Sequence, residues 1–342
     1  MSESPTIPTR FSAAYGVRHP FAGAGLAFAA ETPDLAIAVS AAGGIGALGV
    51  GFVPADPLRA SIHVIRDAVG DRPFNINFIT VFDNDAQIRV CAEERVPVVS
   101  FHWGHPSAEH RRMLQDAGVS VWEQVGTIDD AKRAVDDGVD VVVAQGWEAG
   151  GHNYGGLPTF VLVPRMRDAL GDEQLILAAG GIVDGRGVAG ALALGADGVW
   201  VGTRLVATVE ANVHPEHHRR LLGAEGTDTV RSSIFGPEMP DFNPMRLQRN
   251  RVVAEYTDRL AEVPTERSGE PEIGRTVFLG SEHVKRKFDV LLPTPETTGD
   301  FEEMPFLMGQ GVGSIHEIEP AGVVVERMMR EAHDIIAGLG AR

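Results

Sequence analysis

The fold of this chain is decided by residues 139–155, which read Val139-Asp140-Val141-Val142-Val143-Ala144-Gln145-Gly146-Trp147-Glu148-Ala149-Gly150-Gly151-His152-Asn153-Tyr154-Gly155. The stretch opens as a nearly unbroken apolar run, which is typical of a strand that is buried on both faces of a parallel sheet. The run ends at the polar Gln145, and a glycine-rich loop that carries His152 follows. Because chemistry in parallel α/β folds collects where strands end, the stretch predicts a buried strand with a functional loop at its carboxyl end.

The same unit recurs along the chain as a helix end, a glycine and a short apolar strand. It is found at residues 114–122, 134–142 and 191–201. Glycine suits the left-handed position that closes a helix before a buried strand. Together with further apolar runs, the repeats predict eight strands, at residues 20–25, 45–50, 74–79, 97–101, 119–122, 139–145, 175–179 and 199–201. Eight parallel strands with helices between them favour an α/β (β/α)₈ TIM barrel, with a doubly wound sheet as the alternative.

The strand–helix alternation stops after Arg204. Residues 209–297 read as helical segments, Val209–Leu222 and Met245–Val263, joined by loops rich in proline, glycine and charge. We therefore expect a barrel formed by residues 12–208 plus 298–342, and an inserted helical lid or substrate subdomain at 209–297 that covers the barrel mouth.

Two segments near the carboxyl end complete this prediction. Asp289–Glu303 reads as a connecting linker. Glu319–Leu339 has apolar residues at helical spacing and is expected to return to the barrel as the last helix.

The composition excludes several classes of partner. The chain has 342 residues, with 30 basic against 47 acidic side chains and a net charge of −17. This balance disfavours nucleic acids and anionic membranes, which bind positive patches. The lone Cys91 excludes an intrachain disulfide and a cysteine-cluster zinc site, and no metal site is predicted. The polar start, Met1–Phe11, lacks the apolar core of a signal peptide, so we expect a cytoplasmic protein.

Two glycine loops follow consecutive strands near the end of the predicted barrel. Gly180-Gly181 follows the seventh strand, and Gly202-Thr203 follows the eighth. Loops at these positions commonly hold a phosphate through backbone N–H groups, and glycine allows the backbone to approach it. Asp184 is expected to cap the next helix rather than to bind a ligand. The two loops suit a cofactor with one phosphate group.

These motifs together resemble the nitronate monooxygenase family, also called 2-nitropropane dioxygenase. The resemblance covers most of the chain, and its most specific part is the run from Gln145 to His152. The residues that carry it are Ala144–His152, Ala179–Ile182, Val201–Arg204, Ala38–Gly46, Pro73–Asn77 and Gly309–Gly311. The family usually shows a Pro-Met pair where this chain has Gly25-Leu26, which changes the surface beside the expected cofactor.

The resemblance implies an FMN-binding barrel with a helical lid and a catalytic histidine. The FMN phosphate would lie on Gly180, Gly181, Gly202 and Thr203. The isoalloxazine ring would lie over the barrel mouth near Ala24, Gly25, Asn77, Gln124, Gly150 and Gly151. Gln124 and Gln145 end buried strands, where a buried amide needs a hydrogen-bond partner that the edge of the flavin ring would supply.

His152 is the residue that the resemblance assigns as the catalytic base. An imidazole suits the removal of a proton from carbon next to an electron-withdrawing group. His102 and His105 are rivals, because they too follow the end of a predicted strand. Glu148 is expected to order the loop through hydrogen bonds.

Three functions remain open at this point. The first is an FMN-dependent oxidoreductase that oxidises alkyl nitronates, and possibly neutral nitroalkanes, with O₂. The second is an FMN-dependent reductase that uses NAD(P)H on an enoyl thioester or a quinone. The third is a non-catalytic protein that binds a flavin or an acyl thioester. A homodimer is also considered.

Overall fold

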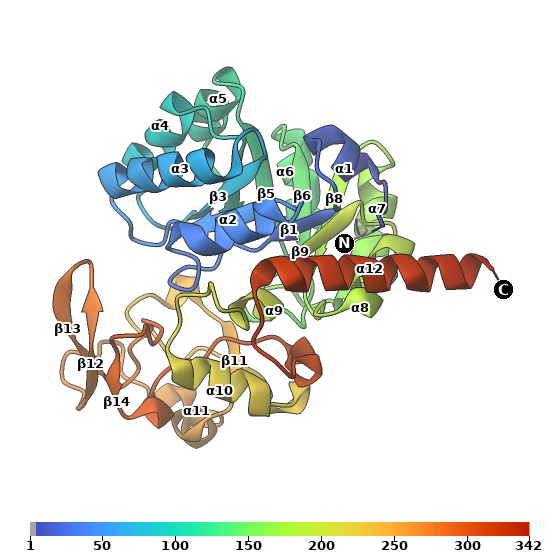
Figure 1. The fold of residues 1–342 in the computed structure, drawn as a ribbon. Helices are drawn as coiled ribbons and strands as arrows, with labels where there is room; N and C mark the ends of the chain where they lie inside the picture. Colours follow the sequence, from blue (N-terminus) through green and yellow to red (C-terminus); the bar gives the residue numbers. More distant parts are fainter. Residues whose placement is uncertain (1–4, 342) are drawn as a thin grey trace.

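The computed structural model describes residues 5–341, and its larger part is a closed barrel of eight parallel strands surrounded by helices (Figure 1). The strand order is β1-β9-β8-β6-β5-β4-β3-β2, and a parallel bridge between Ala22 and Ile45 joins β1 to β2. This closure confirms the predicted TIM barrel over the doubly wound sheet. The barrel strands are β1 (Phe21–Gly23), β2 (Gly46–Gly49), β3 (Phe74–Ile79), β4 (Val98–His102), β5 (Ser120–Val125), β6 (Val141–Gln145), β8 (Leu175–Ala179) and β9 (Gly198–Val201).

The outer layer consists of helices that alternate with the strands. They are α2 (Pro33–Ala41), α3 (Ala55–Val69), α4 (Asp85–Glu93), α5 (Ala108–Asp116), α6 (Ile128–Asp136), α7 (Thr159–Leu170), α8 (Gly185–Ala193) and the short α9 (Thr203–Val206). Gly118, Gly138 and Gly195 end three of these units with φ of 79°, 85° and 97°. These left-handed residues confirm the repeated helix–glycine–strand unit, because an L side chain rarely adopts such angles.

The amino-terminal end of the barrel is plugged by helix α1 (Arg10–Tyr15). The rings of Phe11 and Tyr15 pack on Trp122 of β5, with centroids 5.5 and 5.1 Å apart. The indole N–H of Trp122 donates to the hydroxyl of Tyr15 at 2.7 Å. Since this end is filled by side chains, a ligand can only enter the barrel from the carboxyl ends of the strands.

A buried carboxylate, Asp197, holds α1 and α7 to the start of β9. Its oxygens accept hydrogen bonds from Arg10 Nε at 2.8 Å, from the Arg167 guanidinium at 2.7 Å and from the backbone N–H of Ile176 at 2.9 Å. We expect Asp197→Ala to lower the free energy of unfolding by about 3 kcal/mol, because it leaves the mostly buried guanidinium of Arg167 and the buried N–H of Ile176 without their partner. Urea unfolding would measure this, with the exposed Asp334→Ala as the control. Equal stability of the two variants would contradict the role given to Asp197.

The inserted segment differs from the prediction, because it contains strands as well as helices. Strand β11 (Met245–Gln248) pairs with β10 (Thr229–Ser232) on one side and with β7 (Gly151–His152), of the loop after β6, on the other. Strand β12 (Glu272–Phe278) pairs with β13 (Ser281–Arg286) and β14 (Thr298–Gly299). The helices of the segment are only α10 (Pro215–Gly223) and α11 (Arg251–Tyr256). Short 3₁₀ turns complete the chain: η1 (Gly226–Asp228), η2 (Pro240–Phe242), η3 (Leu260–Glu262), η4 (Phe301–Glu303) and η5 (Gln310–Ser314).

The helical prediction for Met245–Val263 is therefore wrong except over α11, because β11 precedes that helix and only a turn and the 3₁₀ turn η3 follow it. Met245 and Arg246 pair antiparallel with His152 and Gly151, which are distant in sequence, and this pairing overrides the local helical pattern. The helix begins only at Arg251, where the Asn250 side chain accepts from the N–H of Val253. Val209–Leu222 is likewise helical only from Pro215.

The prediction of a linker at Asp289–Glu303 is also wrong, because this segment is packed into the structure. Asp289 is buried and accepts from His283 Nε2 at 2.8 Å and from the N–H of Leu291 at 2.8 Å. The ammonium of the buried Lys285 donates to the carbonyl of Leu291 at 2.6 Å. Buried ion pairs with these hydrogen bonds hold the segment in place.

The last helix, α12 (Ala321–Gly340), confirms the predicted return to the barrel. It packs against α8 and α2, and it runs along the barrel as the long red helix of Figure 1. In Figure 1, the strands of the insert lie together with α10 and α11 below α9, whereas helices α2–α7 of the barrel lie above it.

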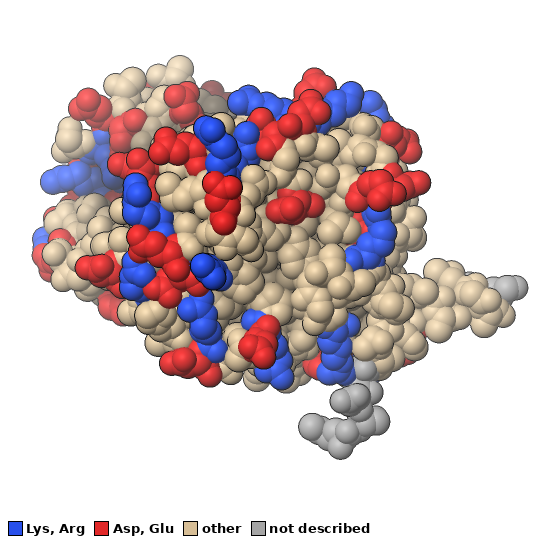
Figure 2. Space-filling view, turned by 90° about the horizontal axis from the view of Figure 1, so that it is seen from above, with Lys and Arg blue, Asp and Glu red and all other residues tan. Residues whose placement is uncertain are grey.

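The surface carries both signs of charge. On the face shown in Figure 2, acidic and basic side chains lie next to one another rather than in separate patches. Within residues 5–341, no helix is long and apolar enough to cross a membrane.

Candidate active site

A single cavity at the carboxyl ends of the barrel strands contains every residue that the sequence analysis placed at the site. These residues are Ala24, Gly25, Asn77, Gln124, Gln145, Gly150, Gly151, His152, Gly180, Gly181, Gly202 and Thr203. The insert lines the same cavity with Met239, Phe242, Met245 and Val290–Leu292. The segment therefore lies over the barrel mouth. Its role as a lid that excludes water stays a prediction.

His152 lies where the barrel loop and the insert meet. Its backbone belongs to β7, which pairs with β11, and its carbonyl accepts from Gln145 Nε2 at 3.0 Å. Its imidazole stacks on Phe242 with centroids 3.6 Å apart, and Trp103 meets it edge-on at 5.6 Å. Nε2 of His152 is buried and has no hydrogen-bond partner among the described residues. This nitrogen therefore has an unused hydrogen-bonding position beside the cavity.

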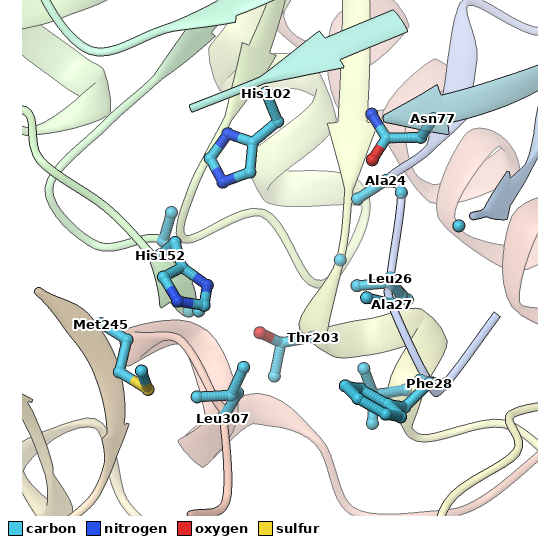
Figure 3. Close-up of a pocket in the computed structure, with 18 of the residues that line it drawn as sticks. Ala24, Leu26, Ala27, Phe28, Asn77, His102, His152, Thr203, Met245 and Leu307 are labelled. Atoms are coloured by element: carbon cyan, nitrogen blue, oxygen red, sulfur yellow. The ribbon is translucent and has the colours of Figure 1, made fainter. Parts of the chain in front are cut away.

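Burial controls the charge of the histidines in the cavity. It lowers the pKa of His152 well below 6.5, and the nearby His102 lowers it further. Burial also lowers the pKa of His102 to about 4. His102 Nδ1 is 2.8 Å from Gln124 Nε2, and Figure 3 shows the His102 ring above His152 on the same side of the cavity. Both rings are neutral near pH 7, and a neutral imidazole has one acceptor nitrogen. That of His102 accepts from Gln124 Nε2, whereas Nε2 of His152 has no partner among residues 5–341.

His105, the other rival of His152, does not line the cavity. Its Nδ1 contacts a carboxylate oxygen of the buried Glu123, and its Nε2 is 3.5 Å from Asp130. These contacts place His105 behind β5, between the barrel wall and its helices. His105 therefore lies outside the cavity, whereas His102 lines it.

The loop that carries His152 is held by two polar side chains. The buried Asn153 donates through Nδ2 to the carbonyls of Trp147 at 2.9 Å and Gly146 at 3.2 Å. Glu148 accepts from the N–H and the hydroxyl of Thr159 at 2.9 and 3.1 Å. Glu148 orders the loop as expected. Asn153 does so too, although the sequence analysis did not single it out.

Gly150 is required by packing within the protein, whereas its expected approach to a cofactor stays a prediction. A side chain at Gly150 would overlap the backbone of Met308 and Gly309. The glycine thus lets the late segment around Gly309 pack on the histidine loop. Gly151 has φ of 74°, which favours glycine for conformational reasons.

The two phosphate-binding candidates lie beside each other at the ends of β8 and β9. Gly180 and Gly181 have φ of 105° and 73°. The hydroxyl of Thr203 accepts from the N–H of Gly309 at 2.9 Å. Asp184 caps α8, as expected, by accepting from the N–H groups of Arg186 and Gly187. A phosphate at this place would therefore depend on the glycine loops rather than on the start of α8.

Gly25, where the chain departs from the family pattern, is in direct contact with Asn77. A Cβ atom at position 25 would overlap the side chain of Asn77. Asn77 in turn donates through Nδ2 to the hydroxyl of Ser100 at 2.8 Å. The side chain of Asn77 thus occupies the space that a side chain at position 25 would need.

The wall of the cavity carries polar atoms that the described part of the chain leaves without a partner. Three buried polar atoms on its wall have no partner within residues 5–341: Gln145 Oε1, His152 Nε2 and Trp200 Nε1. Buried polar atoms are normally hydrogen-bonded, so these atoms indicate a polar ligand. Gly202 leaves open space, because a Cβ there would meet only Ala24 and Leu26, at 3.6 and 3.7 Å.

The sequence analysis missed the residues that the insert and the late segment bring to the cavity. Phe242 contacts the catalytic candidate, and the buried His217 lines the wall with Nε2 3.1 Å from the carbonyl of Leu307. Burial lowers the pKa of His217 to about 4. None of these residues follows a barrel strand, which was the signal used to locate the site.

A comparison with protein families adds to this geometry. The family described as nitronate monooxygenase matches residues 9–87 and 79–331. The chain belongs to the nitronate monooxygenase family. Its members are oxidoreductases that depend on a flavin and act on small molecules with O₂. The chain is therefore an oxidoreductase of a flavin-dependent family, as the resemblance of its motifs implied.

Similarity to individual proteins of known name supports the assignment to this family. The nitronate monooxygenase of Paraburkholderia phytofirmans is 34% identical over 254 residues, which cover 60% of this chain and 69% of that protein. FabK from Thermotoga maritima is 34% identical, with a TM-score of 0.80 over 98% of this chain and 99% of the other. A nitroalkane oxidase from Streptomyces ansochromogenes is 25% identical, with a TM-score of 0.76 over 96% and 99%.

Proposed function

We propose that this protein binds FMN and oxidises alkyl nitronates, and the neutral nitroalkanes from which they form, with O₂. The observation that supports it most directly is the unpartnered Nε2 of His152. This basic nitrogen is buried in a cavity that also presents two glycine loops for one phosphate. When bound, FMN would supply the redox chemistry by taking electrons from the substrate and passing them to O₂.

The chain's own residues would bind the cofactor and move one proton. Gly180, Gly181, Gly202 and Thr203 would hold the phosphate, and the unpaired oxygen of Gln145 would accept a hydrogen bond from the ring edge. His152, neutral at pH 7, would take the proton from the carbon that bears the nitro group. The remaining proposed contacts with the flavin are those of Ala24, Gly25, Asn77, Gln124, Gly150 and Gly151.

An anaerobic reduction experiment tests this function against its alternatives. The yellow protein is mixed without O₂ with a nitronate, NADH or NADPH, and the flavin absorbance is followed. Bleaching by the nitronate alone supports the proposal. Bleaching by NADH or NADPH supports the reductase of an enoyl thioester or quinone, and bleaching by none supports a binding protein. Chromatography of the chromophore released on denaturation distinguishes FMN from FAD.

The pH dependence of turnover should report the buried base. Since the pKa of His152 is lowered, the imidazole stays unprotonated to a pH well below 6.5. The acid limb of kcat/KM for a neutral nitroalkane should therefore lie below pH 6.5. In His102→Gln it should move to higher pH, because the repulsion that His102 adds is removed. Initial rates measured across the acid range would check both, and a limb at or above pH 6.5 in the wild type would contradict the assignment.

Two further parts of the proposal concern the cellular location and the oligomeric state of the enzyme. We propose a cytoplasmic location, with which the buried and unpaired Cys91 agrees. We also propose a homodimer, which sedimentation velocity of the purified protein would test.

A further inference from the structure

Trp103, which directly follows β4, packs against His152 but does not line the cavity. Its side chain is 6% exposed, and it belongs to none of the hydrophobic clusters of the described structure. The aromatic rings around it are those of His102, His152, Tyr154 and Phe242, all edge-on, with centroids 5.7, 5.6, 5.1 and 5.9 Å away. These neighbours belong to the candidate active site and its histidine loop, so Trp103 is part of the surroundings of His152 rather than of the general core.

The backbone conformation of Trp103 brings its indole to this place. Successive residues of a strand point to opposite faces, and His102, the last residue of β4, lines the cavity. A regular continuation of the strand would therefore turn Trp103 toward the outer helices. Trp103 instead has φ of 66°, a left-handed conformation that a bulky side chain rarely adopts. Strain of this kind collects at functional sites.

The indole of Trp103 also joins the barrel to the insert. Its Nε1–H donates to the carbonyl of Asp241 at 2.6 Å. Asp241 belongs to η2, and the next residue in that turn is Phe242, whose ring stacks on His152 at 3.6 Å. One hydrogen bond from a barrel loop thus holds the turn that supplies the stacking partner of His152.

The imidazole of His152 is enclosed on two sides by this arrangement. Phe242 covers one face of the ring with an interplanar angle of 22°, whereas Trp103 meets the ring at 72°. Nε2 of His152 has no hydrogen-bond partner within residues 5–341, so no hydrogen bond from that part of the chain orients the ring through this nitrogen. In Figure 3, the ring lies between the side chains of His102 and Met245. Aromatic contacts therefore set the orientation of the ring, and Trp103 connects them.

We propose that Trp103 is a positioning residue, which clamps the insert onto the barrel and fixes the imidazole of His152 for proton transfer. The inference rests on the proposed function, in which His152 takes a proton from the neutral nitroalkane. Trp103 acts through His152, because it lies outside the cavity lining. Proton transfer needs the base within hydrogen-bond reach of the substrate carbon, and a displacement of about 1 Å slows such a step strongly.

Trp103→Phe tests the clamp, because it keeps an aromatic ring but removes the N–H that reaches Asp241. On the FMN-loaded enzyme, kcat for a neutral nitroalkane should fall about tenfold with little change in KM. Turnover of the preformed nitronate, which needs no base, should stay close to that of the wild type. Trp103→Leu, which removes the ring as well, should lower the nitroalkane rate further. An equal loss for both substrates, or no loss in either variant, would overturn the proposal.

Trp122→Phe is the matched control. It removes a buried indole N–H whose hydrogen bond is of similar length, 2.7 Å to the hydroxyl of Tyr15, at the opposite end of the barrel. This variant should keep the wild-type ratio of nitroalkane to nitronate turnover. In the His152→Asn background, Trp103→Phe should leave that ratio unchanged, because the base that it positions is absent. A further fall of the ratio there would show that Trp103 acts independently of His152.

Amide hydrogen exchange separates failure of this proposal from failure of the function. In the FMN-loaded protein without substrate, Trp103→Phe should speed exchange in residues 239–245, measured by mass spectrometry, whereas Trp122→Phe should not. If the wild type oxidises no nitro compound but this exchange pattern is found, the nitronate function fails and the clamp on the insert stands. If the wild type oxidises nitroalkanes and Trp103→Phe changes neither the exchange nor the ratio, the function stands and Trp103 does not position the base.

Discussion

Replacing His152 by asparagine should lower turnover of a neutral nitroalkane by about 10²–10⁴ while largely sparing the preformed nitronate. A carbon acid needs a base to remove its proton, and loss of a general base costs a factor of this size. The nitronate has already lost that proton. His152 is well placed for the task, because Nε2 is buried, unpartnered and held by the stacking on Phe242.

The measurement compares kcat/KM for nitroalkane and nitronate in the same preparation. FMN content should stay as in the wild type, since the glycine loops are elsewhere. His110→Asn is the control, because His110 pairs with Asp85 at a distance from the cavity. An equal loss for both substrates would indicate a role in binding or in loop order. No loss for either would transfer the base to His102, which His102→Asn would then test.

The second large effect is expected at Gly202. The protein itself has room for a methyl group there, because the nearest atoms to an added Cβ lie at ordinary contact distance, on Ala24 and Leu26. If the FMN phosphate lies against Gly202, a methyl group fills space that the cofactor needs. We therefore expect Gly202→Ala to raise the dissociation constant of FMN at least about tenfold, or 1.4 kcal/mol.

Two readouts make this prediction specific. Flavin retention after dialysis should fall, whereas the melting temperature of the flavin-free protein should stay close to that of the wild type. Gly190→Ala is a matched control, since a Cβ there meets nothing within 4 Å and the residue lies within α8. If Gly202→Ala keeps its flavin, the phosphate is not at this loop.

Much of the barrel was predictable because its signals are local. Gly118, Gly138 and Gly195 each end a helix in a conformation that other residues avoid, and an apolar strand follows at once. Strand ends in a closed parallel barrel converge on one face. The residues chosen after those strands therefore line one cavity, even though they are spread over most of the chain.

The insert was not predictable in the same way, because its strands depend on distant partners. Met245 pairs with His152, and nothing in the sequence around Met245 predicts that contact. Phe242 reaches the catalytic candidate for the same reason. Phe28, Phe52 and Phe82 of the cavity wall, by contrast, carried a usable signal, since each follows a predicted strand. The contacts of Phe278 with Phe52 and Phe28, in contrast, join the insert to the barrel loops and have no local signal.

The contact between Gly25 and Asn77 limits which substitutions position 25 can accept. While Asn77 keeps its present place, any larger residue at position 25 meets an occupied space. The Pro-Met pair usual for the family therefore cannot be restored at Gly25-Leu26 by one step. Either Asn77 must first move or shrink, or both positions must change together. The two residues are thus an epistatic pair, and Gly25→Pro should harm the protein more than Gly25→Pro combined with Asn77→Ala.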